Sequence, residues 1–144
     1  MVQTRCIDCN AMGRQSARPA YSPGPRCSEH WNVEKRRRST AAHARRIEET
    51  YGITGDEYWS IYKSQDGRCY VCQRAKGKSR RLAVDHDHHK GCGHDPKKGC
   101  RQCVRALLCT FCNDVIGKLD EASLARAVHV LKHAPAQGIL NPHG

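Results

Sequence analysis

The spacing of the cysteines constrains this chain more than any other feature of its sequence. Ten of its 144 residues are Cys, and all except Cys92 belong to Cys-x-x-Cys or Cys-x-x-His pairs. Such a pair places two ligands on one turn, as tetrahedral zinc requires. With one Phe and two Trp the aromatic core is small, so bound metal is expected to supply part of the stability. The pairs are Cys6 with Cys9, Cys27 with His30, Cys69 with Cys72, Cys100 with Cys103, and Cys109 with Cys112.

Paired cysteines also occur in disulfide-bonded proteins and in redox proteins. The N-terminus carries no apolar signal segment, and no stretch approaches the roughly 20 apolar residues that span a bilayer. We therefore expect an intracellular protein without a membrane partner, in the cytoplasm of a bacterial host, where thiols stay reduced. A thioredoxin-like protein needs a βαβ context and usually one pair, whereas this chain has several pairs in matched sets. Structural zinc ranks above both alternatives.

The pairs combine into two complete ligand sets and one further candidate set. The N-terminal set, with three thiolates and one imidazole, flanks a loop at 16–25 that is rich in Pro, Gly and Ser, and the alternative is a Cys-containing tail without order. The third set lies in an insertion at 89–103, where His89 competes for the fourth place and the alternative is a loop without metal. Two or three structural Zn²⁺ sites are therefore predicted. The sets are Cys6, Cys9, Cys27 and His30; Cys69, Cys72, Cys109 and Cys112; and Cys92, His94, Cys100 and Cys103.

The charge of the chain indicates a polyanionic partner. Lys and Arg number 25 against 14 Asp and Glu, so the net charge is +11 with His neutral. Nucleic acid relieves the self-repulsion of such an excess, whereas a membrane surface ranks lower because no amphipathic anchor accompanies the charge. A solvated charged face is the alternative for each cationic run. The predicted DNA contacts are Arg36, Arg37, Arg38, Arg45, Arg46, Arg74, Lys76, Lys78, Arg80, Arg81 and Arg105.

Local patterns predict three helices and one strand. A helix over 31–50 ends at Gly52, and a second helix begins at Thr54, which forms a capping box with Glu57. A basic loop over 73–81 leads into a strand over 82–88. A closing helix over 122–134 carries one apolar stripe, at Leu124, Ala127, Val128 and Leu131, which we expect to pack in the core.

The chemically informative residues lie between and beside the four thiolates. Asp85 and His86 occupy the predicted strand, and Asn113 directly follows the last cysteine of the set. A carboxylate and an amide oxygen suit a hard cation such as Mg²⁺ or Mn²⁺, and a neutral imidazole can accept a proton from water. This combination suits phosphodiester cleavage, with zinc holding the strand and the Asn113 helix together. A zinc or supporting role for His86 is the alternative.

These residues resemble the HNH superfamily, and more closely the phage recombination endonuclease VII family. The similarity covers roughly residues 50–134 and includes Tyr51-Gly-Ile-Thr54, Gly67-x-Cys69-x2-Cys72, Val84-Asp-His-Asp-His88 and Val104-Arg-Ala-Leu-Leu-Cys-x2-Cys-Asn-x2-Ile-Gly117. The resemblance implies that Asp85 and Asn113 bind the catalytic cation, that His86 is the general base, and that His88 supports the phosphate. It also implies 5′-phosphate and 3′-hydroxyl products and a homodimer. Junction-resolving members carry an acidic residue where this chain has Ile116.

We therefore predict a small, zinc-stabilised α+β protein with a ββα-metal (HNH, treble-clef-like) nuclease core and flanking helices. The expected organisation is a zinc knuckle at 1–31, a basic helical linker at 32–50, a nuclease domain at 51–134 and a tail at 135–144. The expected function is metal-dependent DNA cleavage, with a non-catalytic zinc-containing nucleic-acid-binding module as the alternative. The remaining histidines, which we expect to be solvated, are His43, His129, His133 and His143.

Overall fold

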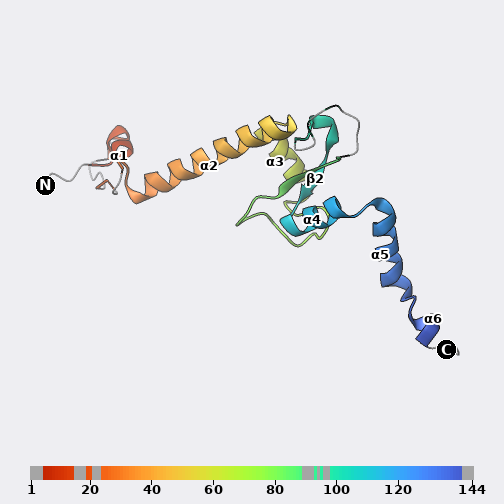
Figure 1. The fold of residues 1–144 in the computed structure, drawn as a ribbon. Helices are drawn as coiled ribbons and strands as arrows, with labels where there is room; N and C mark the ends of the chain where they lie inside the picture. Colours follow the sequence, from red (N-terminus) through yellow and green to blue (C-terminus); the bar gives the residue numbers. More distant parts are fainter. Residues whose placement is uncertain are drawn as a thin grey trace. The chain divides into compact units, whose positions relative to one another are not determined.

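A computed structural model describes residues 5–14, 19–20, 24–88, 93, 95 and 98–140 of the chain. The chain divides into two compact units, Met1–Glu57 and Tyr58–Gly144. The predicted small α+β class is confirmed, whereas the finer division into four segments stays a prediction. In chain order the elements are α1 (Ile7–Ala11), α2 (Ser28–Tyr51), α3 (Gly55–Ser64), β1 (Ala83–His86), the 3₁₀ helix η1 (Arg101–Cys103), β2 (Val104–Leu108), α4 (Thr110–Lys118), α5 (Glu121–His133) and α6 (Gln137–Leu140) (Figure 1).

The first unit is dominated by the long basic helix α2. It ends where the sequence predicts, at Gly52, whose left-handed φ of 65° allows its N–H to donate to the carbonyl of Glu48. Its start is three residues earlier than predicted, because extended Cys27 precedes the first turn and places His30 on that turn. His43 was expected to be solvated but is only 8% exposed, near buried Ile47 one turn away on the same helical face.

Helix α3 begins with the predicted capping box. The backbone N–H of Thr54 donates to the Glu57 carboxylate at 2.8 Å, and the Glu57 N–H donates to the Thr54 hydroxyl at 3.2 Å. Farther along the helix, Tyr58 is buried and donates its hydroxyl to the carbonyl of Leu82, a bond of 2.9 Å. Burial raises the pKa of Tyr58 to about 12. This bond ties α3 to the residue that precedes β1.

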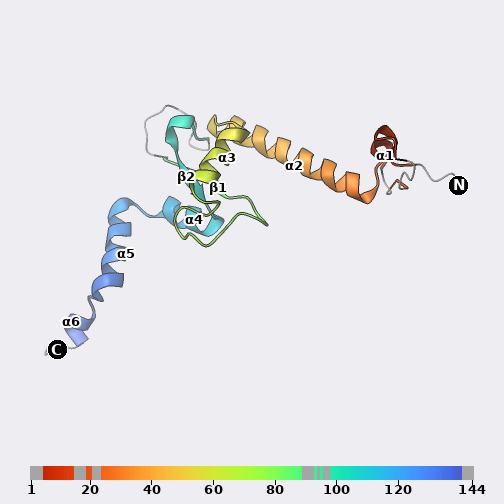
Figure 2. The ribbon, with the colours of Figure 1, turned by 180° about the vertical axis from the view of Figure 1, so that it is seen from behind.

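The second unit is built around a two-stranded antiparallel sheet with α4 beside it. Strand β1 is shorter than the predicted 82–88 and pairs Ala83 with Leu108 and Asp85 with Ala106. Helix α4 contacts both strands, and it lies beside them in both of the opposite views (Figure 1 and Figure 2). The apolar core of this arrangement lies at the end of β2, where Leu107 and Leu108 are 0% and 2% exposed. Strand and helix together therefore position residues 85, 86 and 113.

A single buried amide connects the end of α3 to strand β2. The side chain of Gln65 accepts a hydrogen bond from the N–H of Leu107 at 2.8 Å and donates one to the Leu107 carbonyl at 2.9 Å. It thus pairs with both backbone groups of Leu107, as a neighbouring strand would. Gln65 is 8% exposed, so water cannot readily replace these bonds.

Replacing Gln65 with Ala is expected to destabilise the protein by about 1–3 kcal/mol. The substitution leaves the buried N–H of Leu107 without its acceptor, and an unsatisfied buried group costs roughly 1–3 kcal/mol. Urea unfolding of the zinc-loaded protein measures the change. Ser64→Ala is the matched control, because the Ser64 hydroxyl is exposed and donates to the Ile61 carbonyl within its own helix. Equal stability of the two variants would contradict the assigned role of Gln65.

The expected core packing of the closing helix is wrong. Helix α5 begins at an Asp120 N-cap, which accepts a hydrogen bond from the Ser123 N–H at 2.6 Å, but it buries none of its residues. Leu131 is 86% exposed and Val128 is 49% exposed. An apolar stripe indicates which face of a helix avoids water, and it does not specify what covers that face.

Among the described helices, none has the length and apolar character needed to cross a membrane.

Candidate functional site

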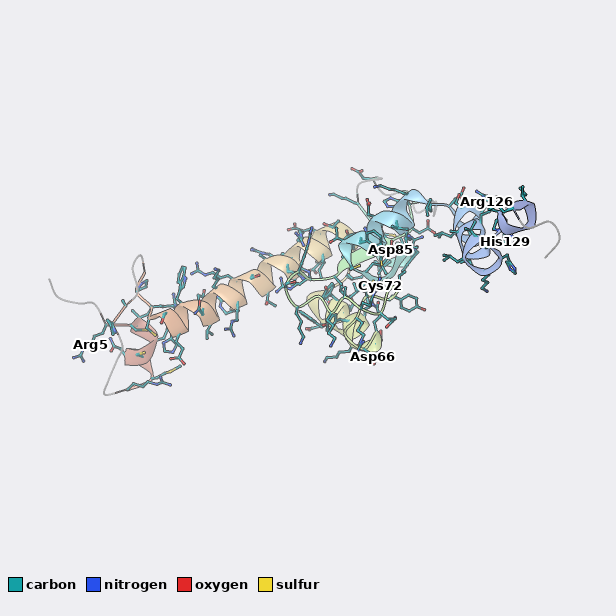
Figure 3. The ribbon with its side chains drawn as sticks, turned by 90° about the horizontal axis from the view of Figure 1, so that it is seen from below. Arg5, Asp66, Cys72, Asp85, Arg126 and His129 are labelled. Atoms are coloured by element: carbon teal, nitrogen blue, oxygen red, sulfur yellow. The ribbon has the colours of Figure 1, made fainter. Side chains whose placement is uncertain are left out.

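The four predicted thiolates of the central set come together in the second unit. The sulfur atoms of Cys69, Cys72, Cys109 and Cys112 all lie within 4.8 Å of one another. Cys109 is the N-cap of α4, and its Sγ accepts a hydrogen bond from the Cys112 N–H at 3.5 Å. Figure 3 marks Cys72 and Asp85 in this unit. The arrangement is compatible with a closed tetrahedral zinc site that joins the loop after α3 to the start of α4.

Two thiols of this set, those of Cys72 and Cys112, have pKa values that are shifted in opposite directions. Hydrogen bonds from the backbone at Ala75 and Arg74 lower the pKa of Cys72 to about 6, which favours the thiolate that zinc requires. Burial raises the pKa of Cys112 to about 12, and hydrogen bonding with Cys109 adds to this effect. Four sulfurs that lie within 4.8 Å of one another are stabilised by a bound cation, since a coordinating thiol loses its proton to the metal.

The N-terminal set is also assembled, in the first unit. The Nδ1 atom of His30 lies 3.4 Å from the Sγ of Cys6, 3.4 Å from that of Cys9 and 3.3 Å from that of Cys27. Tetrahedral zinc with Zn–S of about 2.3 Å and Zn–N of about 2.0 Å requires S···N distances of roughly 3.5 Å. The three sulfurs are nearly inaccessible to solvent. The predicted Cys₃His set is therefore compatible with structural zinc.

The structure describes two of the four residues of the third predicted set, Cys100 and Cys103. Cys92 and His94 lie outside the described residues, so a third zinc stays a prediction. The sulfurs of Cys100 and Cys103 are 3.2 Å apart, and these residues are the N-cap and the last residue of η1. The nine described cysteines are all free thiols, so none of them forms a disulfide.

Strand β1 places Asp85 in a buried position with a cationic partner. The Asp85 side chain is 8% exposed, and both of its oxygens accept hydrogen bonds from Arg105, at 2.8 Å from Nε and 3.0 Å from Nη2. These bonds raise the pKa of the Arg105 guanidinium. Sequence reasoning assigned Arg105 to DNA and missed this pair, because no local pattern relates two residues that are 20 positions apart.

The other predicted catalytic residues lie at the end of β1 and in the first turn of α4. The rings of His86 and His88 are in contact, with centroids 4.3 Å apart, and the Nε2 atom of His86 is buried. The N–H of Asn113 donates to the Cys109 carbonyl at 2.9 Å. Within the described part of the chain, the buried Oδ1 atom of Asn113 has no hydrogen-bond partner. A buried amide oxygen without a donor is costly unless a cation or water satisfies it.

The donor set in this region fits a hard divalent cation. Asp85 supplies a buried carboxylate, and Asn113 supplies a buried amide oxygen from a helix that packs against the same strand. Oxygen ligands of this kind suit Mg²⁺ or Mn²⁺. No sulfur atom of the neighbouring thiolate set is needed for such a site, so the two metals would be chemically distinct.

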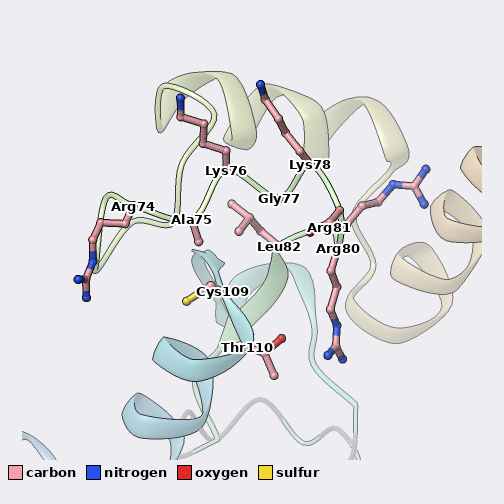
Figure 4. Close-up of a pocket in the computed structure, with 11 residues that line it drawn as sticks. Arg74, Ala75, Lys76, Gly77, Lys78, Arg80, Arg81, Leu82, Cys109 and Thr110 are labelled. Carbon is pink, nitrogen blue, oxygen red and sulfur yellow. The ribbon is translucent and has the colours of Figure 1, made fainter.

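The predicted basic loop lines a cavity of about 360 Å³ in the second unit. Leu82, Cys109 and Thr110 line the same cavity. The labelled cationic side chains diverge from the loop around Leu82 (Figure 4). In α2, Arg37 and Arg38 are exposed and both pair with Glu34, whose pKa falls to about 2 mainly through the bond from Arg37. DNA contacts by either group of cations stay a prediction.

Comparison with known proteins agrees with this geometry. A family model described as recombination endonuclease VII matches residues 44–133. The gene 59 protein of Mycobacterium phage L5 is 52% identical over 138 residues, and that of Mycobacterium phage D29 is 45% identical over 138 residues. Each alignment covers 94% of this chain and 77% of the relative, so the expected likeness to phage proteins is confirmed. The chain belongs to the recombination endonuclease VII family, a membership that supports DNA endonuclease activity.

Proposed function

We propose that this protein is a metal-dependent DNA endonuclease with an HNH-type ββα-metal centre that hydrolyses phosphodiester bonds in branched or duplex DNA. The observation that carries the proposal is the buried Oδ1 atom of Asn113, which has no hydrogen-bond partner among the described residues. It lies directly after the four-thiolate set, in a chain whose family is one of endonucleases. The β1, β2 and α4 elements would form the ββα core.

The proposed roles follow from the chemistry of each side chain. Asp85 and Asn113 would hold Mg²⁺ or Mn²⁺ through oxygen atoms, and such a cation supplies stabilisation of negative charge on the phosphate and on the departing oxygen. His86 would accept a proton from the attacking water, which a neutral imidazole can do near pH 7. His88, whose ring contacts that of His86, would support the phosphate.

The zinc set would act as the scaffold of this centre. Cys109 and Cys112 belong to the start of α4, and Asn113 is the next residue of that helix. Zinc bound by these two cysteines and by Cys69 and Cys72 would fix this turn without the burial of further apolar surface, because the free energy of metal binding becomes free energy of folding. The base and the cation ligands would then be held by two elements whose packing does not depend on a large hydrophobic core.

The test is cleavage of a four-way junction and of a linear duplex of the same sequence by the zinc-loaded protein. We expect strand scission with Mg²⁺ or Mn²⁺ and none in a divalent-free buffer that leaves zinc in place. The products should be sealed by DNA ligase without further treatment, because they carry 5′-phosphate and 3′-hydroxyl ends. A faster rate on the four-way junction would indicate a preference for branched DNA. The absence of scission with any divalent cation would refute the endonuclease.

A non-catalytic nucleic-acid-binding module is the second candidate, favoured by the exposed cations of α2 and of the basic loop at 73–81. It leaves the buried oxygen of Asn113 unexplained, and for that reason it ranks lower. DNA affinity that falls steeply with salt, without scission under any divalent cation, would support it. A homodimer, which would bring two centres to one substrate, also stays a prediction.

A further inference from the structure

A β-bulge places Arg105 opposite the junction between Asp85 and His86. Asp85 pairs with Ala106 across the sheet, and His86 pairs with Val104, so Arg105 lies between two paired residues without a partner of its own in the ladder. A bulge redirects the extra side chain and is common beside functional sites. Here the side chain reaches Asp85 and forms two hydrogen bonds with its carboxylate.

The two members of this pair differ in their exposure to solvent. The Asp85 side chain is 8% exposed, whereas the Arg105 side chain is 43% exposed. A buried carboxylate requires a partner, and the planar guanidinium engages both of its oxygens. The guanidinium itself remains within reach of solvent and of a bound polyanion. The guanidinium of Arg105 thus holds the Asp85 carboxylate in place and can move away from it toward solvent without crossing the core.

We propose that Arg105 competes with the catalytic divalent cation for the Asp85 carboxylate, and that a DNA phosphate relieves this competition by attracting the guanidinium. This inference rests on the proposed cation site at Asp85 and Asn113. Arg105 is a positioning residue: it holds the Asp85 carboxylate in one orientation through two hydrogen bonds while the protein is free. The cation and DNA are consequently bound cooperatively.

The physical basis is repulsion between like charges in a partly buried place. A cation on an Asp85 oxygen lies within a few ångströms of the guanidinium, where solvent screening is weaker than at the surface. Moving the guanidinium to a phosphate converts this repulsion into an ion pair with the substrate. Coupling of this kind is reciprocal, so DNA strengthens cation binding by the same factor that the cation strengthens DNA binding.

Two substitutions separate charge from hydrogen bonding. Arg105→Gln removes the charge and keeps an amide donor for Asp85, whereas Arg105→Lys keeps the charge and loses the bidentate fork. Titration of the zinc-loaded proteins with Mn²⁺, followed by the electron paramagnetic resonance of free Mn²⁺, measures cation affinity. We expect Arg105→Gln to bind Mn²⁺ about tenfold more tightly than the unaltered protein, a usual size for coupled sites, and Arg105→Lys to bind it with nearly unchanged affinity. Unchanged or weaker binding by Arg105→Gln overturns the inference.

The unaltered protein provides a second measurement that does not depend on the folding of a variant. The Nε–H resonance of Arg105 is expected to shift when Mg²⁺ saturates the site, because the hydrogen bond to Asp85 is lost. A resonance that stays in place at saturation overturns the competition. Asp85→Asn serves as the control for the site itself: Mn²⁺ binding as tight as in the unaltered protein would refute the proposed cation site, whereas its loss keeps that site and leaves the resonance to decide on Arg105.

The effect of DNA is measured in a His86→Ala background, where cleavage is suppressed. Mn²⁺ affinity is compared with and without a saturating short duplex, in His86→Ala and in the double variant His86→Ala with Arg105→Gln. Any direct contact between cation and phosphate contributes to both proteins. We expect DNA to raise the affinity more in the protein that retains Arg105, and an equal rise in both overturns the cooperative part of the inference.

Discussion

His86→Ala is expected to lower the rate of DNA cleavage by about 10²- to 10⁴-fold, the usual contribution of a positioned general base. The imidazole is the proton acceptor of the proposed centre, and methyl cannot replace it. Asp85 and Asn113 are unchanged, so zinc content, Mn²⁺ affinity and DNA affinity should stay near those of the unaltered protein. The measurement is the single-turnover rate on a four-way junction at saturating Mg²⁺.

Helix α5 offers a matched control for this substitution. His129 and His133 are exposed and their rings lie 4.5 Å apart, much like those of His86 and His88 at 4.3 Å. His129→Ala therefore removes one member of a similar histidine pair outside the proposed centre, and its cleavage rate should equal that of the unaltered protein. If His86→Ala cleaves as fast as His129→Ala, the imidazole of residue 86 has no part in the chemistry.

Cys112→Ser is expected to abolish the folded state of the Tyr58–Gly144 unit and with it all cleavage. Structural zinc contributes about 10–16 kcal/mol of binding energy in small zinc domains, as much as or more than the roughly 5–15 kcal/mol that stabilises a whole domain. Cys112 is 5% exposed and lies in the first turn of α4, so solvent cannot replace the lost ligand. Zinc stoichiometry and thermal unfolding followed by circular dichroism measure the effect.

Cys27→Ser is the matched control, because Cys27 belongs to the Cys₃His set of the other unit. It should remove one zinc as well, yet leave the unfolding transition of the Tyr58–Gly144 unit in place. A Cys112→Ser protein that keeps its zinc content and its unfolding midpoint would show that the four sulfurs do not hold a structural metal.

Much of the candidate site was predictable because its signals are local. The ligand pairs lie three positions apart, and this spacing alone brings two sulfurs, or a sulfur and an imidazole, onto one turn. The capping box at Thr54 and the left-handed glycine at position 52 are likewise set by a few neighbouring residues. The sequence thus predicted both complete metal-ligand sets and the start or end of two helices.

Burial was predicted less well. His43 belongs to a helix rich in charged residues and is nonetheless buried, whereas the apolar stripe of α5 is exposed. Periodicity describes one element at a time, and burial depends on which other element covers each face. Neither outcome can be calculated from the residues of one helix.

The sequence by itself determined the chemistry of this protein: which residues can bind zinc, which can bind a hard cation, and which can accept a proton. Only the tertiary structure decided that Gln65 pairs with Leu107 and that Arg105 holds Asp85, contacts that span 42 and 20 positions. The first requires the end of α3 to meet β2, and the second requires a one-residue bulge in the register of the sheet. Such contacts arise from the packing of elements against one another, which no pattern within a single element encodes.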